Sequence, residues 1–200
     1  MTTIDHLTLE VADPAAAAGF YTDVLGLGER VRVRPAGAPA TGFSGFTLSL
    51  VASQPSTVDA LVAAAVEAGA TVLKPASKSL WGYGGVVAPP DGTIVTFAST
   101  SKKDTGPATR QVDDLVLQLG VDDVAASKQF YADRGLTVAK SFGRKYVEFD
   151  TGAVTLTLNR RKSLAKVAGV DPDGSGAHGV VIAGADGAFT DPDGFVWEQS

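Results

Sequence analysis

The sequence predicts an α+β fold built from two similar halves, and three observations support this prediction. Landmark residues recur in the same order in both halves of the chain. Several short segments alternate between apolar and polar residues, which is the period of half-buried strands. The helical segments are few, and sheets that are covered by helices on one face belong to the α+β class.

The repeat consists of four pairs of landmarks. Each half has an opening strand, an alanine-rich stretch that ends in Phe-Tyr, a Gly-Leu pair, and a Pro-Asp-Gly turn before an apolar strand. The pairs are 4–11 with 112–119, Phe20-Tyr21 with Phe130-Tyr131, Gly26-Leu27 with Gly135-Leu136, and Pro90-Asp91-Gly92 with Pro192-Asp193-Gly194. Such self-similarity indicates a repeated structural unit. We predict one domain at 1–100 and another at 111–200, joined by a polar, aperiodic linker at 101–110.

The first half is predicted as strand, helix, then strands. Leu7, Leu9 and Val11 alternate with polar neighbours, and Asp13-Pro14 is a good helix start because Asp caps and Pro suits the first turn. A second helix is expected at 56–68, where Gly69 is a plausible end. The remaining predicted strands lie around 31–33 and at 46–51, 71–74, 85–88 and 93–97, with a small-residue loop at 37–45.

The second half follows the same order. Its predicted strands lie at 113–121, 137–141, 146–149, 154–158, 178–183 and 195–198, with a helix at 123–133 and a short one at 163–168. Each half lacks part of one module: the first has a small-residue loop where two strands would stand, and the second has no room for a helix between His178 and its final turn. The sheet edges that remain need a cover. A homodimer would supply one, or the two halves could cover each other.

Composition excludes several classes of function. The net charge is −5 and no large basic face is present, so nucleic acid is not an expected partner. The chain has no cysteine, which removes disulfides, thiolate metal sites and cysteine nucleophiles. No apolar run approaches the ~20 residues that span a bilayer, and the N-terminus lacks the pattern of a signal peptide. We therefore expect a cytoplasmic protein without a membrane partner.

The order of these landmarks resembles the vicinal oxygen chelate superfamily, which includes glyoxalases, extradiol dioxygenases and bleomycin-resistance proteins. The match covers nearly the whole chain in two copies and includes the closing sequence Asp191-Pro192-Asp193-Gly194 before a strand that ends in Glu198. The resemblance implies paired βαβββ modules, with a curved mixed sheet around a small-molecule cavity. In metal-dependent members, a His on a module's first strand and a Glu on its last strand hold the metal, which acts as a Lewis acid.

Only part of the family's ligand set carries over. His6 stands at the first His position, whereas the strand at 46–51 has no His, and Thr96 and Thr155 occupy positions of the family's Glu residues. In the second half Asp114 replaces the first His. The resemblance therefore implies a metal site of Asp114, His178 and Glu198, with Glu198 also the candidate catalytic residue and His6 a ligand-binding residue. The implied cofactor is Zn²⁺, Mn²⁺ or Fe²⁺, or none.

A loop with two aromatic residues is a second candidate. Trp81 and Tyr83 stand among glycines, so the loop could close over a planar ligand, because aromatic side chains supply large contact areas. The alternative is a hairpin whose aromatic residues pack on the sheet. Strand alternation also places Asp114 on one face with Val116 and Gln118, and this polar face is expected to line the cavity.

Two functions follow from these observations. The degraded ligand set favours a binding protein that holds a small molecule in a metal-free cavity, like the bleomycin-resistance proteins. The alternative is a divergent metal-dependent lyase, isomerase or dioxygenase that acts on a substrate with adjacent oxygens. The sequence does not identify the ligand.

Overall fold

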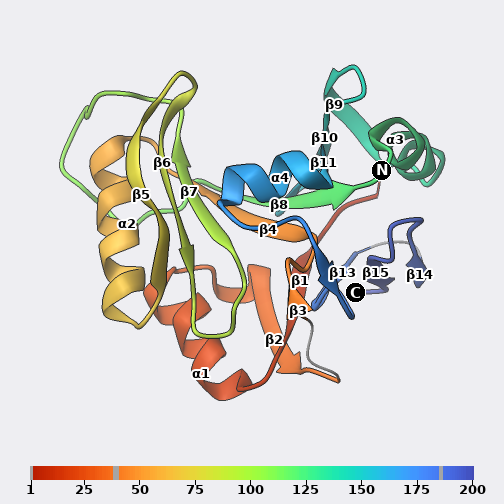
Figure 1. Cartoon of the computed structure of the whole chain (residues 1–200), viewed down its shortest axis with the longest axis horizontal. Helices are drawn as coiled ribbons and strands as arrows, with labels where there is room; N and C mark the ends of the chain where they lie inside the picture. Colours follow the sequence, from red (N-terminus) through yellow and green to blue (C-terminus); the bar gives the residue numbers. More distant parts are fainter. Residues whose placement is uncertain (1, 38–40, 185–186) are drawn as a thin grey trace.

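Two curved sheets, a two-stranded ribbon and four α-helices make up the part of the chain that the structure describes (Figure 1). The computed structural model describes residues 2–37, 41–184 and 187–200. Part of the predicted loop at 37–45, namely 38–40, lies outside the described residues. The α+β class with curved mixed sheets is confirmed. No helix in the described ranges is long and apolar enough to cross a membrane.

The larger sheet has eight strands, half of them from each half of the chain. Its order is β5-β6-β7-β4-β8-β11-β10-β9. The strands are β4 (Phe46–Val51), β5 (Thr71–Ser79), β6 (Gly82–Ala88), β7 (Val95–Ser99), β8 (Asp114–Val121), β9 (Thr137–Phe142), β10 (Tyr146–Asp150) and β11 (Thr155–Arg160). β4 and β8 pair antiparallel at the centre, with Leu48 opposite Leu117. β4 and β8 also each pair in parallel with the last strand of their own module, β7 and β11 respectively.

The smaller sheet has five strands in the order β14-β15-β13-β1-β2. The strands are β1 (His6–Val11), β2 (Val31–Pro35), β13 (Val180–Ala183), β14 (Phe189–Thr190) and β15 (Val196–Glu198). Its centre is again an antiparallel pair, with Leu7 of β1 opposite Ile182 of β13. A two-stranded ribbon of β3 (Thr41–Gly42) and β12 (Gly174–Ser175) adds a further link between the halves. In both sheets, the central strands are thus paired along both edges with strands of the same chain.

Two helices pack on the outer face of the larger sheet, where the main core lies. They are α2 (Pro55–Glu67), over β5, β6 and β7, and α3 (Val124–Asp133), over β10 and β11. Leu115, Leu117 and Leu119 of β8 face this core and are fully buried, as alternation predicts. Asp123 begins α3 as expected, because its carboxylate accepts the amides of Ala125 and Ala126.

The shorter helices are α1 (Pro14–Gly19), which continues as a π-helical turn, and α4 (Arg161–Ala168). Helices α1 and α3 each follow the first strand of a module. A tyrosine near the end of each helix is hydrogen-bonded to a turn of the next module. The Tyr21 hydroxyl donates to Asp91 at 2.8 Å, and the Tyr131 hydroxyl donates to Asp191 at 2.6 Å. Burial raises the pKa of both tyrosines, so they stay protonated donors. The repeated Phe-Tyr landmark therefore has a structural role.

The segment at 101–110 contains no helix or strand, but it is held against the start of α2. The Gln54 side-chain amide donates to the carbonyls of Gly106 and Pro107 and accepts from the amide of Thr105. Gln54 is almost fully buried. This segment is therefore fixed along its length rather than extended into solvent.

Candidate functional site

The face of the larger sheet opposite α2 and α3 is its inner face. Pairing across the centre places Ser49 beside Val116, with Thr96 and Thr155 next to them on the parallel neighbours. These positions lie on the central strand pair β4–β8 and on its two parallel neighbours, β7 and β11. The resemblance places metal ligands on these strands. They carry hydroxyl and methyl groups in place of imidazoles and carboxylates.

Helix α4 lies on this inner face and covers one end of it (Figure 1). Its residues Leu164, Ala165 and Ala168 form a second, separate core cluster with Val86 and Ile94. Val86 and its neighbour Val87 point to opposite faces, since Val87 belongs to the main core. The helix therefore occupies space that would otherwise be open over the sheet.

Two further contacts hold α4 in place. The Lys74 ammonium of β5 donates to the carbonyls of Lys166 and Val167, at 2.7 and 2.6 Å, so a cation caps the end of the helix. The polar groups beneath the helix find partners within the sheet: the Thr47 hydroxyl donates to Gln118 at 2.9 Å. Thr47 and Thr157 are buried. This part of the inner face is packed protein.

Asp114 lies at the other, more open end of the inner face, on the same side as Gln118, as predicted. Its carboxylate accepts a hydrogen bond from the Thr155 hydroxyl, at 3.2 Å to each oxygen. The first-strand and last-strand positions of this module are therefore adjacent, as the resemblance implies. The pair offers one carboxylate and one hydroxyl.

His178 lies in the loop before β13, with both ring nitrogens next to backbone oxygens. Nδ1 is 2.5 Å from the Ser44 carbonyl oxygen, and Nε2 is 2.9 Å from that of Asp193. The ring stacks on Phe195 with centroids 3.8 Å apart. A metal ligand needs a nitrogen lone pair that faces the ion. Here both nitrogens are directed at carbonyl acceptors that come from the fold itself.

Glu198 lies on β15, on the inner face of the smaller sheet, in an ion-pair network. Its two carboxylate oxygens are 3.0 and 3.1 Å from Nη1 of Arg34, and Glu10 is 2.8 Å from Nη2 of the same guanidinium. The hydrogen bond from Arg34 to Glu10, followed by that to Glu198, raises the pKa of Arg34 further above its usual range. Arg34 thus bridges two carboxylates, one on the adjacent strand β1 and one on β15, across β13.

His6 begins β1 on the same face as Thr8 and Glu10. Partial burial, followed by the charge of Arg32, lowers the pKa of His6. A neutral imidazole is therefore favoured, but the structure brings it neither to Asp114 nor to His178 as part of a ligand cluster. Among the described residues, no group of three or more His, Asp or Glu side chains could hold a metal ion.

The three predicted metal ligands are thus not brought together. Asp114 is in the larger sheet, Glu198 is in the smaller sheet, and His178 is in a loop bonded to two carbonyls. The divalent metal that the family implies does not fit these residues, because each already has a hydrogen-bond or ion-pair partner from the fold.

Trp81 and Tyr83 lie in a β-hairpin, but only Tyr83 packs as the hairpin alternative expects, since Trp81 is exposed. β5 and β6 are longer than predicted and meet in a turn at Leu80 and Trp81, whose side chain is 85% exposed. The Tyr83 hydroxyl donates to Asp59 of α2 at 2.7 Å. Tyr83 therefore faces the outer helix and not the inner face. The extension of β6 to Gly82 sets this orientation, since side chains alternate along a strand.

A cavity of about 280 Å³ lies where the two sheets meet. We call it the junction cavity. Four segments line it: the end of β1 with Ala36, the loop that carries Phe43 and Ser44, the turn 91–94, and the loop 177–179. Its volume is close to the lower end of the range of roughly 300–1,000 Å³ for small-molecule pockets.

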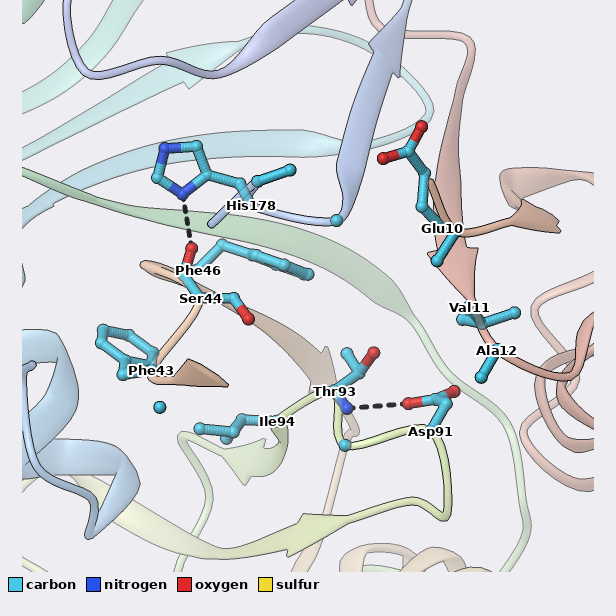
Figure 2. A pocket seen from close by; sticks show the side chains of 15 residues that line it. Glu10, Val11, Ala12, Phe43, Ser44, Phe46, Asp91, Thr93, Ile94 and His178 are labelled. Atoms are coloured by element: carbon cyan, nitrogen blue, oxygen red, sulfur yellow. Dashed lines mark hydrogen bonds between the residues drawn. The ribbon is translucent and has the colours of Figure 1, made fainter. Parts of the chain in front are cut away.

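Polar groups from both halves converge on the junction cavity (Figure 2). Glu10 reaches it from β1, and His178 and Ser44 meet on another side. Asp91 accepts the Thr93 amide at 2.7 Å and the Tyr21 hydroxyl at 2.8 Å. Sequence reasoning did not select Glu10, Ser44 or Thr93, because nothing in their local pattern shows that distant segments meet. The Pro-Asp-Gly turn was recognised, but as a turn.

Comparisons with known proteins agree with this architecture. The family model described as "Glyoxalase-like domain" matches residues 6–98. Residues 6–98 therefore match a glyoxalase-like domain, and the chain as a whole has the fold of the vicinal oxygen chelate superfamily. The predicted resemblance is confirmed. No curated protein of similar sequence was found.

Two solved structures illustrate the similarity of fold. Glyoxalase I from Zea mays is 15% identical with a TM-score of 0.64, and the match covers all of this chain and 92% of that one. A putative dioxygenase from Bacillus subtilis is 14% identical with a TM-score of 0.56, over 96% of this chain and 72% of that one. At these identities the likeness concerns the fold alone.

Proposed function

We propose that this glyoxalase-like protein binds a small molecule in the junction cavity, without a metal held by side chains. The observation that carries the proposal is the separation of Asp114, His178 and Glu198 while polar groups from four segments converge on one cavity. Concave sites with a few convergent polar groups are the usual places for small ligands.

The lining favours a ligand that brings hydrogen-bond donors. The Glu10 and Asp91 carboxylates and the Ser44 carbonyl are acceptors, and Phe43 and Phe46 supply an apolar wall. The Glu10 charge is shared with Arg34, so a neutral donor such as a hydroxyl or primary amide suits the site. Each of these oxygens already has one partner in the fold, and an oxygen with two lone pairs can accept a further bond from a ligand donor.

The test is a thermal-shift screen with polyols, primary amides and small alkylamines, each with and without EDTA. A ligand at a hundredfold its Kd stabilises the folded state by about 2.7 kcal/mol. Ala36→Trp places an indole at the cavity wall and is expected to remove the response. Ala63→Trp is the matched control, because Ala63 is exposed on α2 outside the cavity lining.

Two outcomes would contradict the proposal. One is a response that survives Ala36→Trp. The other is stoichiometric Zn²⁺, Mn²⁺ or Fe²⁺ in protein purified without chelator, lost in His178→Ala together with the ligand response. That result would favour the divergent metal-dependent enzyme.

A further inference from the structure

None of the residues in the basic run Arg160-Arg161-Lys162 lines the junction cavity, although Arg161 donates to the carbonyl of Phe43 in its wall. The structure places this run, together with Arg144 and Ser163, around a separate cleft of about 420 Å³. We call this the basic cleft. Its walls come from the end of β8, the turn between β9 and β10, the end of β11 and the start of α4. Two segments, the turn with Arg144 and the run 160–162, therefore bring four cations to one concavity of a protein whose net charge is −5.

These cations lack partners of opposite charge among the described residues. None of the four appears in an ion pair, although Arg34 and Lys140 elsewhere do. Arg160 and Arg161 bond only to carbonyl oxygens: Nε of Arg160 donates to Arg144, and Arg161 donates to Pro172 and Phe43. Backbone oxygens orient a guanidinium but do not neutralise it.

The two carboxylates at the cleft edge neutralise it only in part. Asp123 caps α3, where its carboxylate accepts two backbone amides, and these bonds, followed by the charges of Arg144 and Arg160, lower its pKa. Asp122 is exposed, and its amide bonds to Asp193. The four cations and two carboxylates that line the cleft thus leave it with a formal net charge of +2.

The start of α4 adds to the positive potential. No side chain caps it, and its first turn holds Arg161 and Lys162 with no acidic residue. Cations at a helix N-terminus are unfavourable, because the helix dipole is positive there and the first amides are unpaired. A local arrangement that costs stability is expected where function requires it. An anion in the cleft would remove the cost.

We propose that the basic cleft binds a small molecule that carries a phosphate group. A phosphate offers three oxygens to the guanidiniums of Arg144 and Arg160, the Lys162 ammonium and the Ser163 hydroxyl, all of which line the cleft. Arginine forks match phosphate geometry, and helix amides favour anions. The cleft shares no lining residue with the junction cavity, so this site and the proposed function stand or fall separately.

The experiment titrates the full chain with inorganic phosphate and with glycerol 3-phosphate at low ionic strength, using calorimetry and thermal shift. The test variant is Arg144→Gln with Lys162→Gln, both exposed and neither buried in the core. The control is Lys102→Gln with Lys103→Gln, which removes the same charge from exposed positions at 101–110. The loss of a charge-assisted hydrogen bond weakens binding about tenfold or more.

The expected result has two parts. Phosphate raises the melting temperature of the wild type and of the control, while the test variant shows a Kd about tenfold weaker or no binding. Without phosphate, the test variant melts at a higher temperature than the wild type, because repulsion at the start of α4 is relieved. With phosphate, this order reverses.

Three results would overturn the proposal. The first is an equal loss of binding in the test variant and the control, which would mean that only net charge matters. The second is a melting temperature that responds no differently to phosphate than to chloride at equal ionic strength. The third is binding to vesicles of phosphatidylglycerol with none to glycerol 3-phosphate, which would assign the cleft to a membrane surface.

Discussion

The inner faces of the two sheets have been filled by different chemistry. In the larger sheet, helix α4 packs over hydroxyl groups that donate to the Gln118 side chain or to a backbone carbonyl of the sheet. In the smaller sheet, the same place is bridged by Arg34 between Glu10 and Glu198. The central antiparallel pairs are alike, so the difference lies in what each sheet has around it.

Coverage by helix α4 separates the two solutions. Beneath α4, Thr47 and Thr157 of the larger sheet are buried, where an unpaired charge would be costly. Away from α4, the same face carries Asp114 and the ion pair of Lys140 with Glu148. The smaller sheet ends in the short strands β15 and β14, and its charged side chains remain partly exposed. Charged side chains that stay in contact with water can occupy this face without a large desolvation cost. The comparison teaches that the inner face of a curved sheet can be occupied either by a packed helix or by an ion pair that bridges its strands.

The largest expected effect concerns the packed face. Leu164→Ala is expected to lower the free energy of unfolding by about 2–4 kcal/mol, because the side chain is buried against Phe43, Val86 and Ile94. Val167→Ala is the control on the same helix, since Val167 is 60% exposed and should change stability by less than about 0.5 kcal/mol. Urea unfolding measures both. Equal effects would show that α4 does not pack on the inner face.

The ion-paired face should respond less. Arg34→Gln leaves Glu10 and Glu198 without their cation and is expected to cost about 1 kcal/mol, because both pairs are partly exposed to solvent. The effect should shrink in about 1 M NaCl, where the Debye length is only about 3 Å. Arg32→Gln is the control, because its partner Glu29 is almost fully exposed. If the loss in the free energy of unfolding were the same at low and high salt, ion pairing would not be its cause.

The smallest effect is a pH dependence from His6. Its pKa is lower in the folded protein than in the unfolded chain, so the unfolded state binds more protons as the pH falls through about 6.5. The free energy of unfolding should therefore decrease from neutral to mildly acid pH, and part of this decrease should vanish in His6→Gln. Urea unfolding at about pH 7.5 and about pH 5 measures it, with His178 present in both proteins. An unchanged decrease in the variant would argue against the burial of His6.

Most secondary structure could be predicted because it depends on local periodicity. β4 was predicted with its observed bounds, and α2 and α3 within a residue of theirs at each end. Alternation along β8 also gave the correct face for Asp114. The pairing of β1 with β13 could not be predicted, since alternation assigns a face to a strand but not a neighbour.

The candidate site was harder to predict for the same reason. His178 matched a ligand position in order along the chain, but its two carbonyl partners come from Ser44 and Asp193, which only the folded chain brings near. A short helix was expected where α4 lies, yet its apolar stripe does not say which surface it will cover. Tyr83 was assigned to a loop because three glycines around it obscured the start of β6.

The position of β1 has a consequence for how the chain is made. One of its two neighbours, β13, leaves the ribosome long after β1, whereas the other, β2, is available almost at once. The first strand must therefore wait, with one edge open, until β13 has been made. Contacts between such distant segments form slowly because a long loop must close. An open strand edge during that interval invites wrong partners, so translation speed and chaperones would govern the yield of this protein.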